Sequence, residues 1–418
     1  ALTVENNTFI IVENNVTIND GSSLVVETQG SFVQNDDGGS MTILDSGTAI
    51  LNKTTPEKQE WFYYTYWSSP VTVQTIGNMF PTVPSDWRYS FNAANFVDTN
   101  ADDIDDDGND WEIAADADTM IPGVGYAVAG ERNSPGLYPR EDIISFTGAF
   151  NTGNITVPIT YGPGNTGIRW NFIGNPYPSA IDFVAFHLAN ASVVEGAAYF
   201  WSQASPPDSG NPGNDAQNLN LNDYAMFTVG TGGAAGGSPI EPNGYIASGQ
   251  GFFIPAQTSL TNPSGNSVTF TNAMRRADNT SNSQFFKGAS SKQSKASAIN
   301  PLENRLWLNL TTDNGVFNQI LIGYVENATN DYDGMSYDAP KILNSELAAA
   351  LYTSIENNDT KYAIQGKDIN SITEDEIIKL GFINVKVNED KPFKLSIAKF
   401  EGAFLSDNAI YIKDNVLG

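Results

Sequence analysis

The 418 residues are 40% hydrophobic and 11% aromatic, which is enough apolar material to build several cores and excludes an intrinsically disordered chain. A formal net charge of −27 argues against a nucleic-acid partner, because so few cations cannot neutralise a run of phosphates. Cysteine is absent, which excludes disulfides, a thiol nucleophile and cysteine-ligated metals, and no run approaches the roughly 18 apolar residues of a membrane helix, so no membrane insertion is expected.

Short strands separated by glycine- and asparagine-rich turns predict an all-β chain. Residues 1–55 alternate apolar bursts with turns such as Asn-Asn and Asp-Asp-Gly-Gly; the bursts are Leu2–Val4, Phe9–Val12, Val16–Ile18, Ser23–Val26, Ser31–Val33 and Met41–Leu44. Their spacing of roughly seven to ten residues fits either a short β-solenoid or a β-meander. Both interpretations stay open at this point.

An aromatic run, Trp61–Trp67, opens a central domain that we place at residues 56–272 and expect to be a jelly-roll-like β-sandwich. In a single strand its side chains would alternate between two faces. Buried sandwich packing is one interpretation, and an exposed row that stacks on sugar rings is the other. The candidate stacking residues are Trp61, Trp67, Trp87, Trp111 and Trp201.

The segment from Asp98 to Glu112 concentrates carboxylates so densely that they repel one another unless a cation is bound. Alternating acidic side chains followed by Gly108 are typical of calcium loops, although Ala114 stands where an EF-hand has its last glutamate. A solvated acidic loop is the alternative. The candidate calcium ligands are Asp98, Asn100, Asp102, Asp103, Asp105, Asp107, Asp110 and Glu112.

Catalytic patterns are weak. The only histidine, His187, follows Phe186 on an expected short helix that Ser179 or Asp182 can cap, and we interpret it as a packing or surface residue. The glycine run at 230–237 has no following lysine and so is no phosphate loop. A glycoside hydrolase with two carboxylates stays a minor alternative, because no acidic pair is singled out by spacing. We therefore expect no enzyme.

Charge separates the chain into parts. Residues 1–274 hold 6 Lys and Arg against 29 Asp and Glu (−23), residues 275–300 hold 5 against 1 (+4), and residues 301–418 hold 10 against 18 (−8). We interpret residues 273–300 as a polar linker. Residues 301–418 are expected to form an Ig-like β-sandwich with short helices over 345–352 and 373–379.

Two strings are specific: Trp-Asn-Phe-Ile-Gly-Asn-Pro-Tyr-Pro-Ser-Ala-Ile-Asp at 170–182 and Gly-Tyr-Ile-Ala-Ser-Gly-Gln-Gly-Phe-Phe-Ile-Pro at 244–255. With Tyr66–Val71, Glu326–Gly334 and Ile410–Asn415 they resemble the C-terminal regions of Bacteroidota proteins that the type IX secretion system exports, adhesins among them. The resemblance implies contact with that export machinery and an extracellular or cell-surface location. In such cargo, strands that carry the sorting signal follow the last of these motifs.

These observations support a structural or adhesive extracellular protein, or a subunit of an extracellular filament that self-associates through β-strands such as the one expected within Leu2–Val12. The alternative is a carbohydrate-binding module with a glycan-binding surface. Thr119, in Asp118-Thr119-Met120, resembles the acceptor of the O-glycosylation sequence used in the same phylum.

Overall fold

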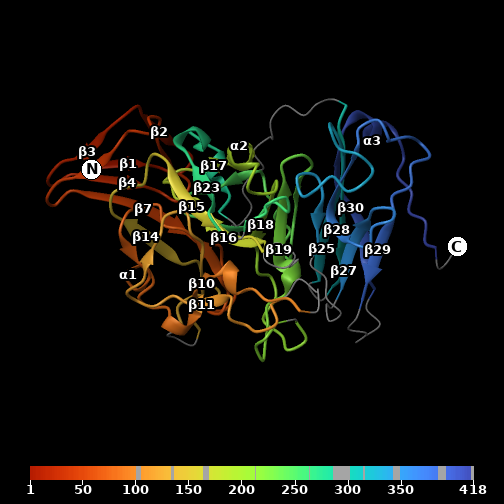
Figure 1. The fold of residues 1–418 in the computed structure, drawn as a ribbon, viewed down its shortest axis with the longest axis horizontal. Coiled ribbons are helices and arrows are strands. Elements are labelled where there is room, and N and C mark those ends of the chain that lie inside the picture. The colour runs from red at the N-terminus through yellow and green to blue at the C-terminus, as the bar shows by residue number, and fades with distance from the viewer. Residues whose placement is uncertain are drawn as a thin grey trace.

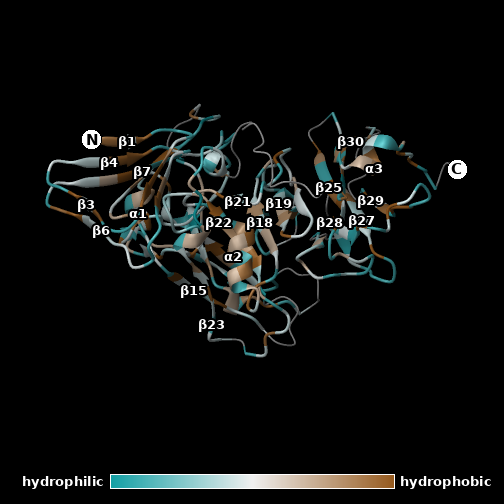
Figure 2. Cartoon of the chain, turned by 90° about the horizontal axis from the view of Figure 1, so that it is seen from above, coloured by the Kyte–Doolittle hydropathy of each residue, from teal (hydrophilic) through white to brown (hydrophobic). Residues whose placement is uncertain are grey.

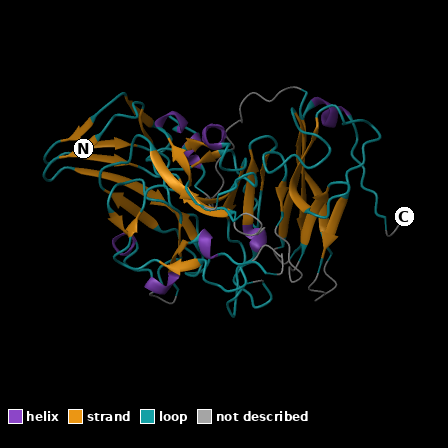
Figure 3. Ribbon diagram, in the orientation of Figure 1, coloured by secondary structure: helices purple, strands orange, loops and turns teal. Residues whose placement is uncertain are grey.

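Strands are the main regular structure of the molecule and helices are few and short, so the all-β prediction is confirmed (Figure 3). The computed structural model describes residues 1–99, 105–132, 136–162, 169–211, 213–262, 264–285, 302–313, 316–341, 349–384 and 392–415. Strands β1 to β30 lie along one long axis, with the two termini at opposite ends (Figure 1). No helix in these ranges is long and apolar enough to cross a membrane.

Parallel pairing identifies the N-terminal region as a β-solenoid, because a meander would pair its strands antiparallel. Each turn of chain stacks on the next, so that Leu2 lies beside Leu24, and Leu24 beside Ala49. The stacked strands are β1 (Leu2–Val4), β4 (Ser23–Val26) and β7 (Thr48–Thr54) on one side, β2 (Phe9–Val12) and β5 (Ser31–Gln34) on the second, and β3 (Val16–Ile18) and β6 (Met41–Ile43) on the third.

Asparagines at the corners explain why the turns of this solenoid are polar. The Asn6 side-chain oxygen accepts a hydrogen bond of 2.8 Å from the Gln29 amide, and the Asn15 oxygen accepts one of 3.0 Å from the Ser40 amide. Each asparagine thus joins the first turn of the solenoid to the second, while apolar residues fill the interior. Strand β7 then pairs with β14 (Ile143–Thr147) and joins the solenoid to the central region.

Two larger sheets form the central region. The five-stranded sheet contains β16 (Trp170–Gly174), β22 (Gly251–Pro255), β18 (Ala197–Trp201), β19 (Tyr224–Thr228) and β20 (Gly232–Ala234). The four-stranded sheet contains β11 (Trp111–Ile113), β10 (Arg88–Phe91), β13 (Tyr126–Val128) and β8 (Thr65–Trp67). Alternate residues of the first sheet face different cores: Ile173 and Phe252 face one, and Phe172 and Phe253 the other.

Short elements complete this region. Strands β15 (Ile155–Ile159) and β23 (Asn266–Phe270) pair beside helix α2 (Phe183–Asn190), whose first turn is capped by Asp182, one of the two predicted caps. The remaining elements are β9 (Gln74–Thr75), α1 (Ile76–Met79), β12 (Thr119–Met120), β17 (Ile181–Asp182) and β21 (Tyr245–Ile246).

The turn after β16 is held by buried polar groups. The Asn175 side-chain amide donates to the carbonyls of Ser179, Ile246 and Ala247, at 2.8–3.0 Å. The Tyr177 hydroxyl donates to the Gly153 carbonyl at 2.6 Å. The specific string at 170–182 therefore forms a packed junction between strands that are distant in sequence.

The first residues of the expected linker pack against this junction. The Arg275 guanidinium donates to the Phe32 carbonyl of the solenoid, to Ser179 and to Asn272. Phe285 is buried against Trp67, with ring centroids 4.9 Å apart. Residues 275–285 thus connect the solenoid to the central region, and residues 286–301 lie outside the described ranges.

One seven-stranded sheet forms the C-terminal region, with β25 and β28 running parallel. Its elements are β24 (Asn304–Thr311), β25 (Phe317–Val325), β26 (Ala339–Pro340), β27 (Ala350–Ser354), β28 (Lys361–Asp368), β29 (Leu380–Ile383), β30 (Lys394–Glu401) and helix α3 (Ala403–Asp407). The helix prediction over 345–352 is wrong where it can be compared, because Ala350–Tyr352 belong to β27. Residues 373–379 form no helix: a turn at 374–375 is closed by the Glu376 amide, which donates to the Thr373 carbonyl at 3.1 Å.

Glycines at 230–237 bring the central and C-terminal regions into close contact. Gly230 lies so near Tyr337 of the C-terminal region that a Cβ there would stand 2.3 Å from a carbon of its ring. The Trp307 indole donates to the Gly233 carbonyl at 2.8 Å, and Lys399 pairs with Glu241 at 2.6 Å. One hydrophobic core runs across this joint, from Phe172 and Phe253 to Trp307.

Candidate functional site

The acidic loop is organised by its own backbone. Asp105 and Asp110 are buried, and Asp105 accepts hydrogen bonds from the amides of Val97 and Gly108. The Asn214 side chain, from a distant loop, donates to the Asp105 carbonyl at 2.7 Å. The predicted ligands Asn100, Asp102 and Asp103 lie outside the described residues.

Electrostatics single out Asp110. Burial, together with the charges of Asp105 and Asp107, raises the pKa of Asp110 to about 6. The predicted ligand Glu112 is engaged elsewhere, because its carboxylate accepts hydrogen bonds from the side chains of Asn92 and Asn95. Within the described residues no three acidic or imidazole side chains converge on one point. A cation beside Asp105 and Asp110 would relieve the unfavourable charge of this pair.

The five candidate tryptophans occupy two environments. Trp67 and Trp201 are buried, whereas Trp61, Trp87 and Trp111 are partly exposed. The aromatic run is not one strand, because β8 covers only Thr65–Trp67 and the preceding residues turn. The run joins the sheet only at Thr65, so strand alternation does not place Trp61 and Trp67 on a common face.

A partly exposed aromatic cluster forms around Trp61. Its ring meets that of Trp87 edge to face at 4.4 Å, and the Arg132 guanidinium lies 5.0 Å above it. Tyr64 stacks on Trp87 at 6.1 Å. Trp111 packs instead among Phe91, Phe172 and Phe253. Trp61 and Trp87 are thus the tryptophans best placed to contact a sugar.

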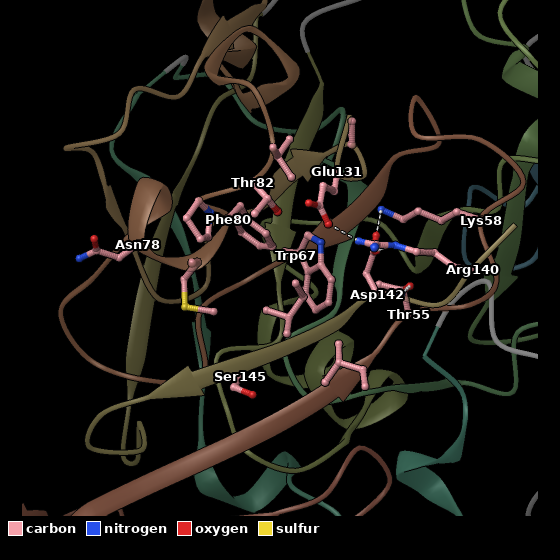
Figure 4. A pocket seen from close by; sticks show the side chains of 16 residues that line it. Thr55, Lys58, Trp67, Asn78, Phe80, Thr82, Glu131, Arg140, Asp142 and Ser145 are labelled. Carbon is pink, nitrogen blue, oxygen red and sulfur yellow. Dashed lines mark hydrogen bonds and ion pairs between the residues drawn. The ribbon is translucent and has the colours of Figure 1, made fainter. Parts of the chain in front are cut away.

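A pocket of about 360 Å³ lies between β8, β14 and α1, and its charged residues were not predicted (Figure 4). Arg140 pairs with Glu131 at 2.8 Å and with Asp142 at 2.7 Å, and Lys58 pairs with Asp142 at 3.2 Å. Burial lowers the pKa of Lys58, and the Asp142 carboxylate opposes that shift. Each charge therefore already has a partner. No local pattern signals this cluster, because the backbone pairing of Lys58 with Arg140 assembles it.

Two further candidates are the exposed Thr119 and the half-buried His187. Thr119 is exposed on β12, so an acceptor hydroxyl there is accessible. His187 lies on α2, where burial lowers its pKa, and its Nε2 has no hydrogen-bond partner among the described residues. No described carboxylate pairs with His187, so its imidazole lacks the orienting group of a general base.

The first turn of the solenoid has an open outer edge. No described strand pairs with the outer side of β1, β2 or β3. A cavity of about 370 Å³ opens there, and its lining includes Leu2, Ile10, Val12, Val16, Leu24 and Phe32. Figure 2 shows β1 in the colour of hydrophobic residues at this end of the molecule.

Comparison with known proteins yields one match. No curated protein and no solved structure matches the chain. A family described as a domain of unknown function, DUF8693, matches residues 1–418. Because that match spans the whole chain, the protein belongs to the DUF8693 family.

Proposed function

We propose that this chain is a non-enzymatic structural or adhesive protein that the type IX system exports, and that it acts at the cell surface or as a subunit of an extracellular filament. One observation carries the proposal: one hydrophobic core packs the solenoid on the central region, a second packs the central region on the C-terminal sheet, and no described strand covers the first solenoid turn. Cores shared between neighbouring regions suit a protein that must resist mechanical force. An unpaired strand edge suits attachment to a strand of another molecule. The resemblance of residues 170–182 and 244–255 to exported cargo supports the location.

Calcium fits the same role. The buried pair Asp105 and Asp110 would share a cation with loop carbonyls or water, and the bound ion would stiffen the loop against Asn214. No reaction step is assigned to this ion.

A carbohydrate-binding module is the second candidate, and the cluster of Trp61, Trp87 and Tyr64 favours it. Wild-type binding on a glycan array that disappears in Trp61→Ala would support this function. Leu188→Ala, on an exposed helix face, is the control for a surface substitution. Absence of wild-type binding to every glycan would exclude it.

Immunogold labelling of intact producing cells tests the first proposal. We expect label on the outer surface or along extracellular fibres, and a protease added outside the cells should remove it. Label confined to the cell interior would contradict the proposal.

A further inference from the structure

The open edge of the solenoid offers backbone groups as well as an apolar surface. The amides of Ser31 and Asn35 donate to the carbonyls of Thr8 and Val12, so these carbonyls of the β2 turn face β5. Alternate residues of a strand direct their peptide groups to opposite sides, so those of Phe9 and Ile11 face the open edge. Their side chains are also 44% and 50% exposed. An added strand would gain hydrogen bonds and apolar contacts together.

The inner side of this edge needs apolar side chains to close it. Ile10 and Val12 alternate with the exposed pair and point into the 370 Å³ cavity at the solenoid end. A strand with two inward aliphatic residues, separated by one outward residue, would continue the stacking of β2 on β5.

A segment with this pattern lies at the other end of the molecule. Residues 409–413, Ala-Ile-Tyr-Ile-Lys, have no strand partner in the described structure, and Tyr411 and Ile412 are 89% and 62% exposed. In an added strand Ile410 and Ile412 would share one face, and Tyr411 would take the other. Ile410 is half-buried against the C-terminal core and would leave it when the strand is added. The aliphatic pair matches Ile10 and Val12, and Tyr411 would lie beside Ile11.

Charge favours the same pairing. Residues 1–52 contain 7 acidic and no basic residues, so an acidic strand would be repelled from this edge. Residues 408–413, ahead of Asp414, contain Lys413 and no acidic residue, in a chain of net charge −27. Residues 408–413 therefore carry a net positive charge and can approach the acidic solenoid without added repulsion.

We infer that residues 409–413 of one copy add as a strand to the open edge of β2 in a second copy, so that copies join head to tail. This inference rests on the proposed function and names the contact that builds the assembly. Because the two surfaces lie at opposite ends of the long axis, the contact is heterologous and leaves a free end on each copy (Figure 1). Repetition produces an open chain of molecules.

Variants of the full chain separate the two surfaces. Ile412→Asp disables the donor segment, and Ile11→Lys disables the acceptor edge. Ile377→Asp and Ile143→Lys are the controls, because these isoleucines are even more exposed, at 81% and 73%, but lie on other elements. Circular dichroism and thermal melting check that all four variants fold.

Light scattering coupled to size-exclusion chromatography measures assembly against protein concentration. Wild type and both controls should grow in mass with concentration, and each test variant should associate about tenfold more weakly or worse. An equimolar mixture of Ile412→Asp and Ile11→Lys should form dimers and nothing larger, since one intact donor meets one intact acceptor. A synthetic peptide of residues 408–415 should dissociate wild-type assemblies.

Two results would overturn the inference: assembly of Ile412→Asp as strong as that of wild type, or wild type that stays monomeric at every concentration. If surface label on producing cells persists in either case, the proposed function stands and a different contact builds the assembly. If wild type neither assembles nor labels the surface of producing cells, the proposed function is overturned as well.

Discussion

Arg275 is the residue that most directly fastens the solenoid to the central region. Its guanidinium serves three acceptors on separate segments and lies 4.8 Å from the Tyr177 ring. Arg275→Ala would leave buried acceptors unpaired, and we expect it to lower the free energy of unfolding by about 3 kcal/mol. Urea unfolding measures the change.

Neighbouring substitutions make this test specific. Arg276→Ala removes an adjacent arginine whose ion pairs are partly exposed, at 3.5 and 4.0 Å, so its cost should stay below about 1 kcal/mol. Arg275→Lys should recover less than half of the loss, because one ammonium cannot reproduce the planar fork. Equal costs for Arg275→Ala and Arg276→Ala would contradict this role.

Lys53 predicts how stability depends on pH. Its ammonium is buried, donates to the Thr28 carbonyl and Ser248 hydroxyl at 2.7 and 3.1 Å, and has a pKa lowered by burial to about 7. Between pH 7 and 10.5 the unfolded chain keeps a proton that the folded protein has released, so stability rises with pH in this window. One lysine contributes at most about 1.4 kcal/mol per pH unit.

Lys53→Met removes that contribution. The free energy of unfolding should therefore rise less steeply from pH 7 to 10 in the variant than in wild type. Denaturant unfolding at several pH values measures both slopes, and the exposed Lys379→Met controls for the loss of a positive charge. Identical slopes for wild type and Lys53→Met would show that burial does not perturb this amine.

At the scale of elements, the glycine-rich segment is the joint between the central and C-terminal regions. Gly230→Ala forces a methyl group against the ring of Tyr337 in the C-terminal region and should cost about 1–3 kcal/mol, since the ring or the backbone must move. Gly38→Ala, whose nearest neighbour would be the Asp36 side chain at 3.3 Å, should stay within about 0.5 kcal/mol. A harmless Gly230→Ala would mean that the joint is loosely packed.

The acidic loop predicts a response to calcium. At a calcium concentration about 100 times the dissociation constant, binding should stabilise the protein by about 2.7 kcal/mol, seen as a higher melting temperature that a chelator reverses. Asp110→Asn should abolish most of the shift, whereas Asp313→Asn, in an exposed turn, should preserve it. The same melting temperature with calcium and with chelator would exclude a structural ion.

Local sequence patterns predicted individual strands and caps better than they predicted which segments contact one another in the fold. The spacing of the N-terminal bursts indicated a solenoid or a meander, and Asp182 was one of two candidate caps, because turns and caps depend on adjacent residues. Contacts between distant segments were invisible: Arg275 and Phe32 are 243 residues apart. Burial of Trp201 likewise depends on a core shared with Trp307 of another region. The candidate site was predictable as an acidic loop, but the distinction of Asp105 and Asp110 needs the fold.

At the scale of the whole molecule, an open solenoid edge lies at one end and an exposed apolar segment at the other, with two packed cores between them. We propose that this shape serves an extracellular structural or adhesive role. Electron microscopy of native material from producing cells, labelled for this protein and prepared with and without a calcium chelator, tests this role. We predict labelled filaments or surface assemblies that the chelator loosens. Label found only on dispersed molecules away from the cell surface, with or without calcium, would contradict it.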